Sequence, residues 1–134
     1  MWTCPKCERR FKHDNQSHYC TTKSIDDLFE GKPEDLILAF DKILVDVFEF
    51  GDISIGASVN TVIFTNKKAF LILRPMSKVL DLKFYYHEPL KSAKFHKVGE
   101  YGKKFYHHIR VKDEFEVDDE VIQLLKKGYN HGLK

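Results

Sequence analysis

Residues 59–86, which read VNTVIFTNKKAFLILRPMSKVLDLKFYY, decide the fold of this chain. Three runs rich in β-branched, aromatic and aliphatic residues are separated by two short polar segments, NKK and PMSK. Such runs, joined by short turns, are typical of antiparallel strands that follow one another as a meander. We therefore predict that these residues form the centre of an antiparallel sheet.

The third run indicates which face of this sheet is buried, because a strand directs alternate side chains to opposite faces. Its apolar phase contains Leu80, Leu82, Phe84 and Tyr86, and its polar phase contains Asp81, Lys83 and Tyr85. An apolar sheet face needs a cover, and helical segments on both sides of the meander can supply it. The predicted fold class is α+β, with an antiparallel meander sheet covered by N- and C-terminal helices.

Helix signals flank the meander. A short helix is predicted to reach about Glu30 and to end at Gly31. Pro33 suits the first turn of a longer helix that ends by Gly51, and the last helix should start near Asp118. Apolar residues recur at helical spacing in the two longer helices, at Leu36, Phe40, Ile43, Leu44 and Val47 and at Val121, Leu124, Leu125 and Tyr129.

The remaining strands are less sharply marked. Residues 52–58 fit either an edge strand or a loop, and residues 90–98 are ambiguous. Pro89 breaks the chain after the meander, since proline cannot donate to a sheet ladder. Residues 99–102, GEYG, are predicted to form a turn, and residues 103–112 to form the last strand.

The composition is that of a globular chain. Its 134 residues, of which 43% are hydrophobic and 31% charged, suffice for one domain and a small appendage. No apolar run approaches the ~18 residues of a membrane helix, and the first residues lack the apolar core of a signal peptide. We expect a cytoplasmic protein without a membrane partner.

The formal net charge of +2 conceals a separation along the chain. Residues 24–60 hold two basic and nine acidic residues (net −7), and residues 61–112 hold twelve basic and three acidic residues (net +9). The predicted sheet is therefore basic, and the segment with the long helix is acidic. The two can compensate each other within one domain, or an exposed basic sheet face can attract an anion.

All three cysteines lie within the first 20 residues. An odd number of cysteines, with Cys4 and Cys7 in a Cys-x-x-Cys spacing, favours a metal site over disulfides. His18 and Cys20 follow at a distance that suits a small zinc finger. Four such ligands can hold tetrahedral zinc as Cys3His, so zinc is the predicted cofactor.

The opening of this module resembles a short Cys-Cys-His-Cys zinc finger, because Phe11 follows the second cysteine by four residues. The last two ligands are closer together than the usual spacing of about three to five residues. His13 is therefore an alternative ligand. We predict a zinc-finger-like module over residues 1–22, followed by the α+β domain over residues 24–134.

Segments of the main domain resemble an uncharacterised domain family of bacteria and archaea, some members of which are labelled as predicted transport proteins. These segments include SIDDLFEG at 24–31, TVIFT at 61–65, LDLKF at 80–84 and VGEYG at 98–102. The resemblance covers about residues 24–130. Some members of that family are joined to nuclease-like domains, which implies work near DNA.

The C-terminal part is also similar to small α+β domains of the double-wing type, which include proteins assigned to DNA binding. The similarity lies in HHIRV at 107–111 and in the acidic cap and helix that follow. It places a histidine at His107, whose phase matches that of Ile109 and Val111. A core histidine with one hydrogen bond fits this phase, and a histidine at a pocket between sheet and helix is the alternative.

The other phase of the last predicted strand is basic and aromatic. It contains Tyr106, His108, Arg110 and Lys112, which would join Lys83 and Tyr85 on one face if the two strands are neighbours. Basic residues interleaved with tyrosines can bind phosphates and stack on bases. A solvated face of an antiparallel sheet has a similar pattern.

Enzyme motifs are not found in the sequence. It contains no G-x-S-x-G, P-loop or H-E-x-x-H pattern, and no cysteine outside the N-terminal module. We therefore expect a zinc-containing binding module with nucleic acid as its leading partner. A protein–protein adaptor that docks through the finger is the alternative, and an accessory to a nuclease-type enzyme ranks third.

Overall fold

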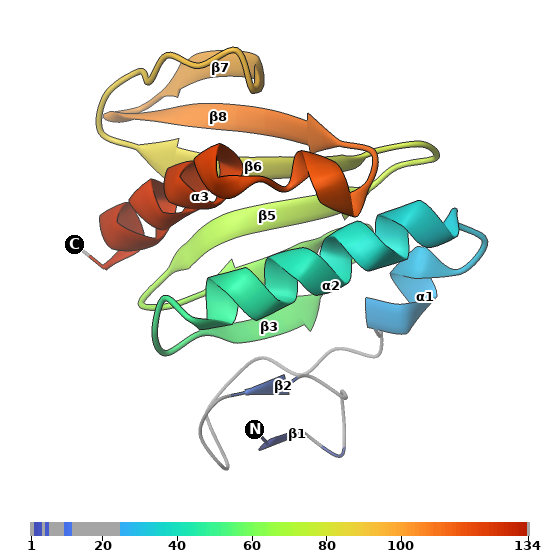
Figure 1. Cartoon of the computed structure of the whole chain (residues 1–134). Helices are drawn as coiled ribbons and strands as arrows, with labels where there is room; N and C mark the ends of the chain where they lie inside the picture. Colours follow the sequence, from blue (N-terminus) through green and yellow to red (C-terminus); the bar gives the residue numbers. More distant parts are fainter. Residues whose placement is uncertain (1, 4, 6–9, 12–24, 134) are drawn as a thin grey trace.

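The predicted meander lies at the centre of the sheet (Figure 1). In the computed structural model, which describes residues 2–3, 5, 10–11 and 25–133, strands β4, β5 and β6 pair antiparallel in chain order. They span Val62–Thr65, Ala69–Pro75 and Leu80–Tyr86. The predicted alternation in the third strand is largely confirmed, since Leu80, Leu82 and Phe84 are fully buried, although Asp81 is also buried and Tyr86 is half-buried.

Further strands extend the meander on both sides. The strand order is β1-β2-β3-β4-β5-β6-β8-β7, and all neighbours are antiparallel. The added strands are β1 (Trp2–Thr3), β2 (Arg10–Phe11), β3 (Ser54–Ala57), β7 (Phe95–Tyr101) and β8 (Lys104–Val111). Because β8 lies between β6 and β7, the chain runs from β6 to the far edge before it returns.

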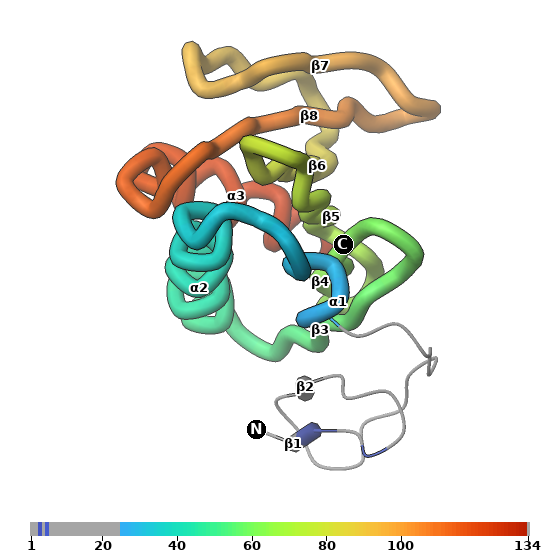
Figure 2. Tube along the Cα trace, turned by 90° about the vertical axis from the view of Figure 1, so that its right-hand side faces the viewer, coloured from blue at the N-terminus to red at the C-terminus, as the bar shows by residue number. Residues whose placement is uncertain are grey.

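Helices α2 (Glu34–Phe48) and α3 (Asp119–Gly132) cover one face of the sheet, as two views at right angles show (Figures 1 and 2). The short helix α1 (Ile25–Phe29) packs against β3, and the 3-10 turn η1 (Glu114–Glu116) leads into α3. The predicted stripes are largely confirmed, because Leu36, Phe40, Ile43, Val47, Val121, Leu124, Leu125 and Tyr129 are buried. Within the described residues, no helix has both the length and the apolar character needed to cross a membrane.

Helix α3 approaches the sheet closely at Gly128. A Cβ atom added there would lie 2.9 Å from the Cβ and Cδ2 atoms of Phe84, well inside the separation at which carbon atoms attract each other. The glycine thus lets the helix backbone rest against this side chain. The ring of Phe84 in turn stacks on His107, with 5.0 Å between the centroids.

The predicted turn over residues 99–102 is corrected by the structure. Gly99 and Tyr101 belong to strand β7 and pair with β8, and the hairpin turns at Gly102, whose φ is +63°. Two glycines so close together favour a turn when only the local sequence is considered. Pairing with a long neighbouring strand outweighs the low strand propensity of Gly99.

The N-terminal segment continues the sheet. Strand β2 pairs with β3, with Arg10 opposite Ile55 and Phe11 opposite Ser54. Residues 54–57 therefore form a strand, but an inner one rather than the predicted edge. The described part of the N-terminal segment is joined to the main domain through this strand pairing.

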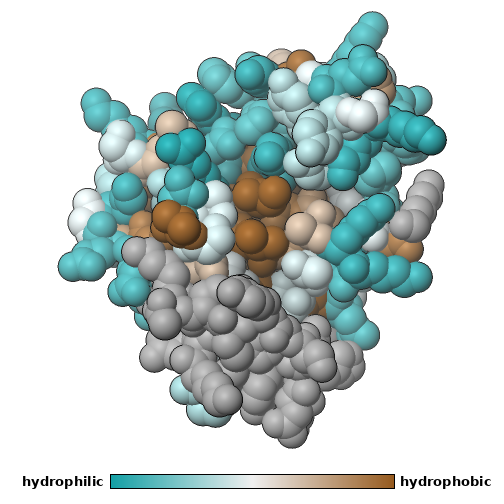
Figure 3. Space-filling view, turned by 180° about the vertical axis from the view of Figure 1, so that it is seen from behind, coloured by the Kyte–Doolittle hydropathy of each residue, from teal (hydrophilic) through white to brown (hydrophobic). Residues whose placement is uncertain are grey.

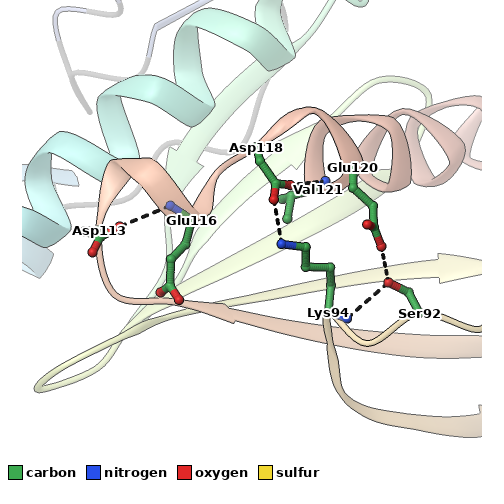
Figure 4. Close-up of polar contacts among 7 residues, drawn as sticks. All are labelled: Ser92, Lys94, Asp113, Glu116, Asp118, Glu120 and Val121. Carbon is green, nitrogen blue, oxygen red and sulfur yellow. Dashed lines mark hydrogen bonds and ion pairs between the residues drawn. The ribbon is translucent and has the colours of Figure 1, made fainter.

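Polar contacts anchor the loop before β7 to the start of α3, which begins after Asp118 as predicted (Figure 4). Asp118 accepts the backbone N–H of Val121 at 3.0 Å and contacts Lys94 Nζ at 2.5 Å. Ser92 donates to the carboxylate of Glu120. The hydrogen bond between Lys94 and Asp118 lowers the pKa of Asp118 and raises the pKa of Lys94.

Candidate nucleic-acid interface

The sheet face opposite α2 and α3 is not covered by any helix of the described chain (Figures 1 and 2). Seen from behind, it has an apolar centre with hydrophilic residues gathered above it (Figure 3). Ile63 of β4 and Ile72 of β5 are register partners and are half-buried. The strands β6, β8 and β7 carry the polar part of this open face.

Strands β6 and β8 are direct neighbours, which is the condition under which the predicted basic residues share one face. The register pairs Lys83 with His108, Tyr85 with Tyr106 and Asp81 with Arg110. Five of the six predicted residues are therefore brought together. Lys112 lies beyond the end of β8 and donates its backbone N–H to the carboxylate of Glu116 at 2.6 Å, so it stands apart from this group.

Strand β7 adds residues that the sequence analysis did not include. Lys97 pairs with His108, Gly99 with Tyr106, and Tyr101 with Lys104. The signal was the alternation within KVGEY at 97–101, which the two nearby glycines obscured. We call Lys83, Tyr85, Lys97, Tyr101, Lys104 and Tyr106 the tyrosine–lysine patch.

The lysines of this patch lie against its tyrosine rings. Lys104 Nζ is 4.1 Å from the centroid of the Tyr85 ring and 5.8 Å from that of Tyr101. Lys83 Nζ is 5.5 Å from the Tyr85 centroid, and the rings of Tyr85 and Tyr101 are 6.3 Å apart. Such cation–π contacts contribute about 0.5–1 kcal/mol at exposed sites. They orient the side chains and leave the lysine charges uncompensated.

The buried carboxylate on this face already has partners. Asp81 Oδ2 lies 2.8 Å from Nδ1 of His108, and Asp81 Oδ1 accepts a hydrogen bond from Nε of Arg110 at 3.3 Å. In contrast, no carboxylate of the described chain forms an ion pair with the three lysines of the patch. The cations available to an anion are therefore these lysines, more than the predicted Arg110.

His107 belongs to the covered face. It is fully buried, its ring centroid lies 5.0 Å from those of Phe84 and Phe95, and its Nε2 accepts the backbone N–H of Leu90 at 3.0 Å. Burial lowers the pKa of His107 because it disfavours the charged ring. The backbone of Phe105 raises the pKa and so offsets part of this lowering. Within the described residues, Nδ1 of His107 has no hydrogen bond of ordinary geometry. These contacts describe a core histidine and give no support to a role in a pocket.

A cavity of about 420 Å³ lies between α1 and α2, next to β3. Its lining is apolar at Phe29, Phe40 and Ile55 and acidic at Asp26 and Asp41. The carboxylates would repel a phosphate-bearing ligand. This cavity therefore does not suit the phosphate-bearing ligand considered for the open face, and it is not part of the candidate interface.

The predicted zinc ligands, Cys4, Cys7, His18 and Cys20, and the alternative ligand His13 lie outside the described residues. Within the described residues, no group of three or more His, Cys, Asp or Glu side chains is arranged to hold a metal ion. Strands β1 and β2 pair through Trp2 with Phe11 and Thr3 with Arg10. Residues 4–9, which include the Cys-x-x-Cys motif, thus connect two paired strands.

Comparison with known proteins gives one family. Residues 25–132 match a family whose description is "Domain of unknown function" (DUF5655). The search of curated proteins and the search of solved structures give no match. The matched range contains all described helices and strands β3 to β8, and therefore the whole tyrosine–lysine patch. The resemblance to an uncharacterised domain family is confirmed for this range, and the chain belongs to the DUF5655 family.

Proposed function

We propose that this protein is a zinc-containing module that binds nucleic acid through the open face of β6, β8 and β7. The observation that carries the proposal is the pairing of β6 with β8, which brings Lys83, Tyr85 and Tyr106 onto one exposed face. The pairing of β7 with β8 adds Lys97 and Lys104. Three lysines without a carboxylate partner in the described chain form a positive surface.

A positive surface of this kind favours a polyphosphate ligand over a single anion. Phosphates repeat along a nucleic-acid strand, and each lysine that meets one releases condensed counterions. The lysines come from three neighbouring strands, which lie about 5 Å apart in a sheet. The patch therefore extends over two strand spacings, about 10 Å, and suits an extended chain of phosphates.

The proposed zinc site rests on ligand chemistry and on the sequence spacing. Cys4 and Cys7 have the Cys-x-x-Cys spacing with which two thiolates hold one zinc ion in small structural sites. His18 and Cys20 would complete a Cys3His site, with His13 as the alternative ligand. When bound, zinc would supply stability to this short segment rather than chemistry.

Elemental analysis of the purified protein tests the metal. We expect one zinc per chain, and we expect Cys20→Ser to lower the affinity for zinc. If Cys20→Ser keeps full affinity and His13→Ala loses it, the assignment of the ligands is wrong. Protein that is purified without chelators and carries no metal would contradict the zinc site itself.

Nucleic-acid affinity measured against salt tests the interface. We expect binding to a mixture of DNA and RNA that weakens as salt rises, and a salt slope that falls by about one unit for each lost phosphate contact. The test variant is Lys83→Ala with Lys104→Ala. The control is Lys67→Ala with Lys68→Ala, which removes the same charge from two exposed lysines in the turn between β4 and β5.

Three outcomes are informative. A slope that falls in the test variant and not in the control supports the open face as the interface. A slope unchanged in both variants removes the sheet from the interface and leaves the basic residues of the N-terminal module, Lys6, Arg9, Arg10 and Lys12. No binding at low salt contradicts the proposal and favours the adaptor that docks through the finger.

A further inference from the structure

The tyrosines of the patch come from three neighbouring strands of the open face. Tyr85 is on β6, Tyr106 is its register partner on β8, and Tyr101 is on β7. Tyr101 is 64% exposed, and the other two are half-buried. A solvated sheet face does not need three large aromatic side chains on neighbouring strands, since smaller polar residues would satisfy the same positions. These rings therefore call for an explanation beyond the fold.

Gly99 makes room for one of these rings. A Cβ atom at Gly99 would lie 2.2 Å from the Oη atom and 2.3 Å from the Cζ atom of Tyr106. Tyr106 thus extends across β7 and occupies the space above Gly99 where any other residue would place its side chain. Within a strand, a glycine often marks such a close approach. Lys97 Nζ lies 5.8 Å from the centroid of the same ring.

A second pair of rings flanks one lysine. Tyr85 and Tyr101 have centroids 6.3 Å apart, and Lys104 Nζ lies 4.1 Å from the first and 5.8 Å from the second. Proteins that bind single-stranded nucleic acid combine aromatic rings with cations, since a base can stack on a ring while its phosphate meets the cation. On β6, β8 and β7, the rings that could stack on bases lie next to the lysines that could meet phosphates.

We infer that Tyr85, Tyr101 and Tyr106 form a stacking platform for unpaired bases, so that the ligand is single-stranded nucleic acid. This inference rests on the proposed function and narrows it. A duplex presents phosphates outward and stacks its bases on one another. It would therefore contact the lysines of the patch, and none of its bases would stack on the tyrosine rings. An unpaired strand uses both. Gly99 is a positioning residue in this arrangement, because it lets Tyr106 lie across β7.

The competing explanation is that the lysine–tyrosine contacts only stabilise the sheet surface. Cation–π pairs do contribute at exposed positions. In that case, removal of a ring would change the stability of the fold and would leave the ratio of single-strand to duplex affinity unchanged. The ratio is therefore the measurement that separates the two explanations.

Fluorescence anisotropy with labelled oligonucleotides supplies this ratio. The probes are a 12-nucleotide oligo-dT, a 12-nucleotide oligo-U and a 12-base-pair duplex, all at one low salt concentration. We expect the full chain to bind both single strands more tightly than the duplex. The difference between oligo-dT and oligo-U shows whether DNA or RNA is the better source of the unpaired strand.

Tyr101→Ala is the main variant, because Tyr101 is exposed and its loss leaves the core intact. We expect about a tenfold loss of affinity for the single strands and no change for the duplex. Phe115→Ala is the matched control, since Phe115 is an aromatic residue, 83% exposed, on η1 and outside the patch. We expect this control to bind all three probes as the unmodified chain does.

Gly99→Ala tests the positioning of Tyr106. We expect it to weaken single-strand binding about as much as Tyr106→Ala does, and the double variant to show no further loss, because both changes remove one stacking ring. Thermal melting checks that each variant is folded. If Gly99→Ala is folded and binds single strands normally, the positioning role is wrong.

The outcomes separate this inference from the function on which it rests. Equal binding of single strands and duplex, with Tyr101→Ala unchanged, overturns the platform and leaves the phosphate-binding face standing. A loss of duplex binding equal to the loss of single-strand binding in Tyr101→Ala also overturns it. If no probe binds at low salt, the platform and the proposed interface fail together.

Discussion

The two faces of this sheet use the same strands for different purposes. Along β6, Leu80, Leu82 and Phe84 are fully buried under the helices, and the residues between them face outward. On the covered face, the volume and shape of the side chains are fixed by close packing. On the open face, close packing restricts fewer side chains, with Gly99 beside Tyr106 as an exception, so the clustered tyrosines and lysines are more informative about function than any residue of the core.

Adjacent residues of β6 give the largest test of this difference. We expect Phe84→Ala to lower the free energy of unfolding by about 3–5 kcal/mol, because it leaves a cavity in the core. We expect Tyr85→Ala to cost about 1 kcal/mol or less and to weaken nucleic-acid binding. Urea denaturation of both variants measures this contrast. Similar losses of stability would show that the open face is part of the packed structure.

The close approach of α3 offers a second test on the covered face. Gly128→Ala adds a methyl group that would meet Phe84 at 2.9 Å, and we expect it to cost about 1–3 kcal/mol through overpacking. Asn130→Ala, at an exposed position of the same helix, is the control and should stay within about 0.5 kcal/mol of the unmodified protein. If Gly128→Ala is equally neutral, the helix is free to move away from the sheet.

The buried histidine predicts a pH dependence that belongs to the covered face. Burial lowers the pKa of His107 in the folded state, so the unfolded chain binds more protons. Stability should therefore fall as the pH decreases below about 6.5, by at most about 1.4 kcal/mol per pH unit, and level off below the folded pKa. Denaturation at several pH values measures this slope.

Two variants assign that slope to its source. His107→Leu should remove the contribution, and His96→Gln, at an exposed position of β7, should leave it in place. A slope that persists in His107→Leu would show that another group is responsible.

The smallest effect concerns the contact between the start of α3 and the loop before β7. Asp118→Asn keeps a good helix cap and removes the ion pair with Lys94 that holds the loop before β7. Because the pKa of Asp118 is lowered in the folded state, this pair stabilises at neutral pH, and its contribution is lost as the pH falls through the folded pKa. The difference in melting temperature between variant and unmodified protein should be larger at pH 7 than at pH 3. An equal difference at both values would point to the cap instead.

Local patterns were enough to predict the covered face. The alternation in β6 and the stripes of α2 and α3 follow directly from the periods of strands and helices. The phase of His107 likewise placed it in the core, where it is found. Each of these predictions depends on residues that are close together in the sequence.

The open face depends on pairing between distant segments. The pairing of β6 with β8 joins residues that are 19 to 31 positions apart, which no local period encodes, whereas β7 and β8 pair as a hairpin. The prediction for Lys83 and Tyr85 therefore depended on an assumed strand order, and Lys97, Tyr101 and Lys104 were missed altogether. The zinc ligands lie outside the described residues, so the metal site stays a prediction.

The central position of β8 has a consequence for the synthesis of this protein. Strands β6 and β7 both leave the ribosome before β8, yet they touch in the finished sheet only through it. The platform therefore cannot exist on a nascent chain that ends before Lys104, whatever the ligand. A chain arrested at that point should show no binding, and one extended through α3 should recover it. Until β8 is synthesised, the edges of β6 and β7 that pair with it are without a partner strand. The last strand both completes the sheet and creates its binding surface.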